Sequence, residues 1–147
     1  MSKLNLVCLI FSIVACCSVF YACQSENDLN YARYYTNGKR LYDTHCQNCH
    51  GGDGKGLGKL IPPLTDTVFL KAHKQKLACW IKYGTSDTML VNHIVYSSNM
   101  PANANLPDID IAALVTYVTN TFGNKQGLYD VNDASAHLKK CIISNKR

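Results

Sequence analysis

Cys46-Gln47-Asn48-Cys49-His50 is a C-x-x-C-H sequence, the attachment signature of a c-type haem. In such a motif the two thiols bond to the two vinyl groups of the porphyrin, and the following histidine is held where it can ligate the iron. With 8 cysteines and 5 histidines in 147 residues, random order would give about 0.014 such matches. The motif therefore predicts covalent haem attachment through Cys46 and Cys49, with His50 as one axial ligand.

Two other kinds of site use paired cysteines. A structural zinc site needs four ligands, commonly with a second ligand pair, and the nearest candidates beyond the motif, His73 and Cys79, lack that spacing. A thioredoxin-like dithiol needs a βαβ setting, and the sequence has no such pattern. Haem attachment is favoured, and a metal site or a redox thiol pair is the alternative.

The first 22 residues have the composition of a signal peptide. Lys3 supplies a positive start, and the stretch that ends at Ala22 is strongly apolar. Cys23 follows this small residue and precedes a polar run, a pattern that resembles the lipobox of a bacterial lipoprotein. We therefore expect residues 1–22 to be removed and Cys23 to carry a lipid.

Two alternatives for the leader stay open. Cys16 follows a better lipobox but would leave an apolar run on the mature chain, and an uncleaved leader is about long enough to span a bilayer. In each case the rest of the chain is exported to the periplasm and attached to a membrane. Residues 23–30 are then expected to be a lipidated N-terminus and tether.

The remaining cysteines suggest a disulfide. Cys79 and Cys141 are left once the leader, the lipid and the haem have taken the other six. Because the compartment is oxidising, we expect these two to form a disulfide that fastens the C-terminal segment. The alternative is two free thiols buried as small apolar side chains.

Hydrophobic periodicity predicts an all-α chain. The glycine-rich stretch 51–58 and the stretch 85–105, rich in Ser, Asn and Pro, are expected to be irregular. The expected helices cover about residues 30–45, 67–76, 75–83, 108–122 and 133–142, with the boundary between the second and third left open.

The charge balance excludes one class of partner. The formal net charge is +5, but no basic stripe with interleaved aromatic residues occurs. We therefore expect no nucleic-acid binding.

Together these features resemble class I monohaem cytochromes c over about residues 32–123. Gly38 and Tyr42 precede the haem motif in four-residue steps, as the glycine and aromatic residue of that family's first helix do. In the family these residues pack against the last helix, where Leu114 and Tyr117 are the matching positions here.

The resemblance also implies the iron's surroundings. Pro62 lies twelve residues after His50 and matches the proline whose carbonyl accepts a hydrogen bond from the haem histidine, although Pro63 competes for the role. Met100 lies in the irregular loop and matches the sixth ligand.

Other side chains could take the place of that sixth ligand. Met89, His73 and His93 are the alternatives. One residue departs from the family pattern: Pro107 stands where a serine usually caps the last helix, so we expect the cap to move to Asp108.

The resemblance implies a cytochrome c fold at residues 31–123, in which the first and last helices cross around one covalently bound haem c. Residues 124–147 would form a short helical extension. The implied function is a membrane-anchored electron carrier, not an enzyme, that serves redox proteins such as a terminal oxidase or a periplasmic dehydrogenase. The alternatives are a dedicated electron-accepting subunit of such a complex, and a haem enzyme or gas sensor with an open iron site.

Overall fold

The structure is a computed structural model that describes residues 7, 12–13 and 26–144. Cys23 and Cys16, the two candidate lipid sites, lie outside the described residues. The chain separates into two units between Asn30 and Tyr31, and the second unit contains the C-x-x-C-H motif.

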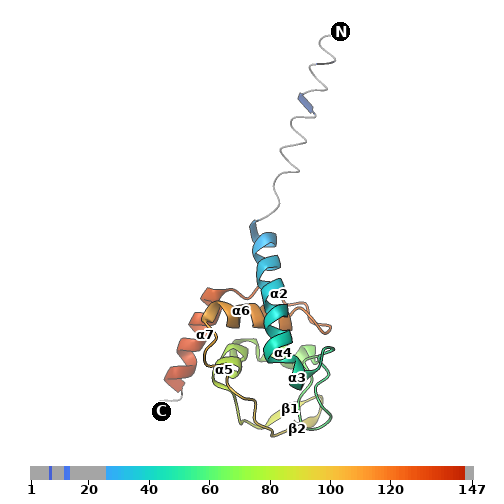
Figure 1. Cartoon of the computed structure of the whole chain (residues 1–147), viewed down its shortest axis with the longest axis vertical. Coiled ribbons are helices and arrows are strands. Elements are labelled where there is room, and N and C mark those ends of the chain that lie inside the picture. The colour runs from blue at the N-terminus through green and yellow to red at the C-terminus, as the bar shows by residue number, and fades with distance from the viewer. Residues whose placement is uncertain (1–6, 8–11, 14–25, 145–147) are drawn as a thin grey trace. The chain divides into compact units, whose positions relative to one another are not determined.

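The described chain is mainly helical, as the all-α prediction requires (Figure 1). One antiparallel hairpin lies between the helices and pairs Leu90 with Val95. The elements in order are α2 (Glu26–His45), α3 (Gln47–His50), α4 (Thr67–Ala72), α5 (Lys74–Tyr83), β1 (Met89–Val91), β2 (Ile94–Tyr96), α6 (Asp108–Val118) and α7 (Val131–Ser144).

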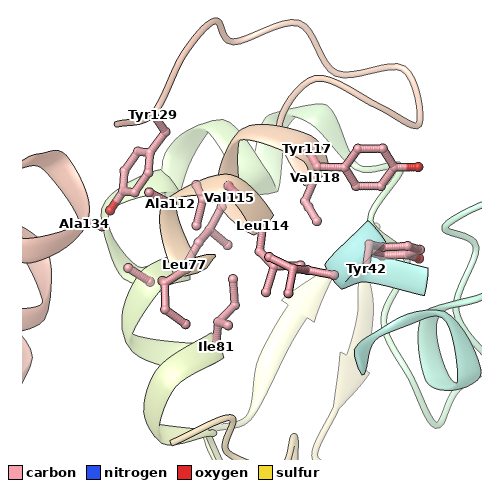
Figure 2. Packing of buried hydrophobic residues seen from close by; sticks show 14 of the residues in the cluster. Tyr42, Leu77, Ile81, Ala112, Leu114, Val115, Tyr117, Val118, Tyr129 and Ala134 are labelled. Carbon is pink, nitrogen blue, oxygen red and sulfur yellow. The ribbon is translucent and has the colours of Figure 1, made fainter. Parts of the chain in front are cut away.

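Helix α6 is the centre of the core. Every residue from Ile111 to Val118 is buried, and Figure 2 shows Leu114 and Val115 among the side chains of Leu77 and Ile81 from α5. A helix that is buried all round must be covered on every face.

The C-terminal segment covers a second face of α6. The Thr116 hydroxyl is fully buried; it donates to the carbonyl oxygen of Tyr129 at 2.9 Å and accepts from the Tyr129 amide at 3.1 Å. Helix α7 packs on both α5 and α6, with Ala134 and Leu138 buried in the interface. The predicted extension is therefore part of the core of this domain.

Helix α2 crosses α6 at Gly38, where the two backbones meet. A Cβ atom added at Gly38 would overlap the carbonyl oxygen of Ala113 and the Cβ of Tyr117. One turn later the Tyr42 ring packs against Tyr117, with 5.3 Å between the ring centroids. The crossing that the resemblance implies for Gly38 and Tyr42 is confirmed, and the backbone of Ala113 and the Cβ of Tyr117 lie nearest the glycine.

The hairpin corrects the expectation that residues 85–105 are irregular throughout. Its turn places Asn92 and His93 at φ values of 48° and 61°, the left-handed conformations that two-residue hairpin turns require. The Asn92 amide also donates to Asp66 Oδ2 at 3.1 Å. Strands of three residues carry little periodic signal, which is why the sequence pattern does not reveal them.

Two helix ends differ from the expected ones. Residues 26–30, expected to be tether, are helical, with Glu26 and Asp28 placed where acidic side chains favour a helix N-terminus. Helix α6 ends at Val118 instead of Phe122, because the Asn120 side chain bonds the backbone at Gln126 and Gly127 and reverses the chain.

The start of α6 and the extent of α7 also differ. Pro107 itself is the N-cap of α6 and makes no side-chain cap bond, so the cap has not moved to Asp108. Helix α7 begins two residues earlier than expected and continues to Ser144. A disulfide joins Cys79 of α5 to Cys141 of α7, with 6.0 Å between the Cα atoms, a separation that a disulfide spans.

The helix crossing gives the first testable prediction. Gly38→Ala should lower the free energy of unfolding by about 1–3 kcal/mol, because the added methyl group forces α2 and α6 apart and this outweighs its gain in helix propensity. Denaturant unfolding followed by circular dichroism measures the change. Gly52→Ala is the matched control, since its nearest contact would be Gln47 Nε2 at 3.7 Å, and a loss as large at Gly52 would contradict the account.

Candidate functional site

The C-x-x-C-H motif forms a single helical turn directly after α2. The Cys46 amide donates to the carbonyl oxygen of Tyr42 at 2.9 Å, and the His50 amide donates to that of Cys46 at 2.9 Å. Residues three and four apart share one face of a helix. Local backbone geometry therefore places Cys46, Cys49 and His50 side by side at one wall of a cavity.

The His50 ring is oriented by a backbone acceptor. Its Nδ1 lies 3.1 Å from the carbonyl oxygen of Pro62, and because a carbonyl can only accept, Nδ1 must carry the proton. Nε2 then keeps its lone pair. Burial lowers the pKa of His50 below its usual value, and the bond to Pro62 partly opposes that shift, so the imidazole is neutral at neutral pH and fit to bind a metal.

The loop between His50 and Pro62 is folded back on itself by backbone hydrogen bonds. The Gly56 amide donates to the carbonyl oxygen of His50 at 2.8 Å, and the Leu64 amide donates to that of Gly54 at 2.7 Å. Leu57 and Ile61 form an antiparallel bridge between these points. These bonds return the chain so that Pro62, and not Pro63, faces the histidine.

The cavity has a volume of about 1230 Å³, counting the open space at its mouth, and its walls are mostly apolar. It is bounded by the motif, α4, α5, α6 and the segment that leads to Met100. Side chains from each wall include Cys46, Cys49, His50, Pro62, Phe69, Trp80, Met100 and Leu114.

Met100 lines the same cavity as His50, and both of its backbone polar groups pair with Thr85. Its amide donates to the carbonyl oxygen of Thr85 at 2.9 Å, and its carbonyl accepts from the Thr85 amide at 3.0 Å. Met89 also lines the cavity, whereas His73 and His93 are not among the lining residues. The structure thus brings both methionine candidates, but neither histidine alternative, to the site.

Aromatic side chains stiffen the wall that α4 and α5 contribute. The Phe69 ring packs on His73 and on Trp80, with centroid separations of 4.2 and 6.1 Å. His73 is held there through its Nδ1, 2.9 Å from the carbonyl oxygen of Phe69. His73 therefore packs against Phe69 without lining the cavity itself.

The thiols differ in their surroundings. Burial raises the pKa of the Cys46 thiol to about 11, with a further contribution from the neighbouring Cys49, so Cys46 is a neutral thiol at physiological pH. Cys49 is exposed. Both are free of disulfides and remain available for another covalent bond.

Comparison with known proteins agrees with this geometry. The family model for cytochrome c matches residues 35–122. The chain belongs to the cytochrome c family. Cytochrome c-552 of Thermus thermophilus is 25% identical over 113 residues, covering 74% of this chain and 86% of that protein. A second cytochrome c-552 of the same species is also 25% identical over 113 residues, with 74% of this chain and 76% of that protein covered.

Membership of the family makes this chain a haem protein that transfers electrons, with a single covalently bound haem c. The residues of the cavity fit that group. Two free thiols, a histidine with its lone pair directed away from Pro62, and a thioether share one apolar cavity. Within the described residues, no three His, Cys, Asp or Glu side chains gather to hold another metal ion.

The residues that support Met100 were not predicted from the sequence. Thr85 pairs with its backbone, and Gly84 lies against the same segment. The helix end expected at residue 83 was the one available signal, because a contact between residues 85 and 100 leaves no periodic trace in the sequence.

Proposed function

We propose that this cytochrome c carries single electrons between redox proteins through a haem ligated by His50 and Met100 and bonded to Cys46 and Cys49. The observation that carries the proposal is the hydrogen bond from His50 Nδ1 to Pro62, in a cavity that Met100 also lines. Nε2 is thereby the nitrogen free to bind iron, and a thioether is the soft ligand expected opposite it.

When bound, the haem supplies an iron that changes between the ferric and ferrous states. The residues that hold the iron ligands would keep the structural difference between these two states small. His50 is fixed by Pro62, and Met100 is fixed by Thr85. The walls around the iron would be mostly apolar, so they would offer little stabilisation to charge on the iron. Together with the His/Met pair, this favours a raised reduction potential.

Two protein ligands leave no open iron position for a substrate. This supports a carrier over a haem enzyme or a gas sensor, each of which needs a free sixth site. A role as the fixed cytochrome subunit of a periplasmic dehydrogenase or terminal oxidase uses the same site. Purification of the native protein from its membrane distinguishes the two roles, because a fixed subunit remains with its larger partner.

Replacement of Met100 tests the ligand assignment. Met100→Ala should abolish the sulfur-to-iron absorption band of the oxidised protein, allow the reduced protein to bind carbon monoxide, and lower the reduction potential on the order of 0.1 V, a fraction of the ~0.8 V that axial ligands span. Absorption spectroscopy and redox titration measure these changes. Met89→Ala is the control, because Met89 lines the same cavity; loss of the band in that variant instead would assign the role to Met89.

Attachment to a membrane is proposed through Cys23. In the part of the chain that the structure describes, no helix is long and apolar enough to span a membrane. The support for lipidation is the sequence alone: an apolar leader, a small residue at Ala22, and a polar run after Cys23. An anchor of this kind would place the carrier at the periplasmic face of the membrane.

Intact-mass spectrometry tests the anchor. The native mature chain should begin at Cys23 and carry the added mass of a lipid together with one haem. Cys23→Ser should leave the leader unprocessed at that position and remove the lipid mass, whereas Cys16→Ser should change nothing. A mature chain that begins at any residue other than cysteine would exclude lipidation.

A further inference from the structure

We propose that the C-terminal brace, defined as residues 124–144 together with the Cys79–Cys141 disulfide, is a positioning element that holds Met100 on the iron by fixing helix α5. This inference rests on the proposed ligation by His50 and Met100. Residues 124–144 of the brace lie beyond residue 122, where the match to the family model ends.

The end of α5 is the support on which the Met100 segment rests. Gly84 follows the helix at φ 71°, and a Cβ atom there would meet the carbonyl oxygen of Met100 at 2.6 Å and the amide of Ala102 at 2.9 Å. The next residue, Thr85, pairs with Met100 through both backbone groups. The backbone of Met100 therefore cannot shift unless the end of α5 shifts or these contacts break.

Two further bonds extend this support along the same segment. The carbonyl oxygen of Ile81, in the last turn of α5, accepts from the Asn103 amide at 3.0 Å. The Lys82 ammonium donates to the carbonyl oxygen of Leu106 at 2.5 Å. The end of α5, from Ile81 to Thr85, thus holds the segment 100–106 along its length.

The brace holds α5 in turn, at both its start and its middle. Lys74, the first residue of α5, donates to the carbonyl oxygen of Gln126 at 3.1 Å and lies 5.9 Å from the centre of the Tyr129 ring. In the middle of the helix, Cys79 is bonded to Cys141 of α7. The disulfide is next to Trp80 and two residues from Ile81, and both of these line the cavity.

The brace is itself anchored on elements other than α5. Ser135 of α7 donates to Asp108 Oδ2 at 2.6 Å, at the start of α6. The Val131 amide donates to the Tyr34 hydroxyl of α2 at 3.2 Å. Because these contacts do not involve α5, they hold the brace in place on α2 and α6. The brace can therefore restrain the movement of α5.

The physical consequence concerns local opening. A methionine leaves the iron when its loop opens, and loops open with smaller free energies than whole domains. The segment between β2 and α6 contains no regular helix and depends on α5 for its backbone bonds. A fixed α5 makes that opening rarer, so release of Met100 should be slow while the disulfide is closed.

The double variant Cys79→Ser/Cys141→Ser, made in the full-length haem-loaded protein, tests the brace. Imidazole is added to the oxidised protein as a competing ligand, and loss of the sulfur-to-iron absorption band gives the rate at which Met100 is released. We expect this rate to rise by about tenfold or more, within the range of energetic coupling between sites in proteins. When the double variant is titrated with urea, the sulfur-to-iron band should disappear at a lower urea concentration than the helical circular dichroism signal.

Two further variants separate positioning from general stability. Gly38→Ala weakens the α2–α6 crossing, away from α5, and its band and helical signal should disappear together. Lys74→Ala removes the hydrogen bond from the start of α5 to Gln126 of the brace and should also speed imidazole binding. It also provides the test if the double cysteine variant does not accumulate.

The outcomes distinguish this inference from the function on which it rests. An unmodified protein that has no sulfur-to-iron band overturns both, because no Met100–iron bond then exists to be positioned. A normal band with unchanged imidazole rates in the double cysteine variant and in Lys74→Ala overturns the brace alone. Faster Met100 release in these two variants, but not in Gly38→Ala, supports it.

Discussion

The hydrogen bond from His50 Nδ1 to the carbonyl oxygen of Pro62 is the interaction on which the site depends. It fixes which imidazole nitrogen keeps its lone pair, and it holds the ring toward the cavity. The glycine-rich loop is folded by its own backbone bonds so that this carbonyl can reach the histidine. The motif and the shape of the loop therefore act together to present a neutral histidine in a fixed orientation.

A second constraint is that the central helix of so small a domain must be covered on every side. The haem cavity lies along one face of α6, and α2 crosses another at Gly38. The C-terminal segment covers a further face through the bonds between Thr116 and Tyr129. The extension thus completes the core, and this explains why a segment beyond the match to the family model has buried residues such as Ala134 and Leu138.

The parts of the molecule that rest on local chemistry or on fixed spacing could be predicted from the sequence. The motif and the helix class follow from residue type and periodicity, and the Gly38 crossing follows from the family resemblance. The hairpin at Met89–Tyr96 was missed because three-residue strands are too short for a pattern, and the end of α6 was misplaced because Asn120 reverses the chain through side-chain bonds to later residues. The support of Met100 by Thr85 could not be predicted, since it joins two irregular segments.

The central claim is a haem closed on both faces by protein ligands and used for electron transfer. One absorption spectrum of the purified native protein, recorded oxidised, reduced, and reduced under carbon monoxide, tests it most directly. We predict the spectrum of a low-spin c-type haem, a sulfur-to-iron band in the oxidised form, and no change with carbon monoxide. A high-spin spectrum, or rapid carbon monoxide binding, would contradict the claim.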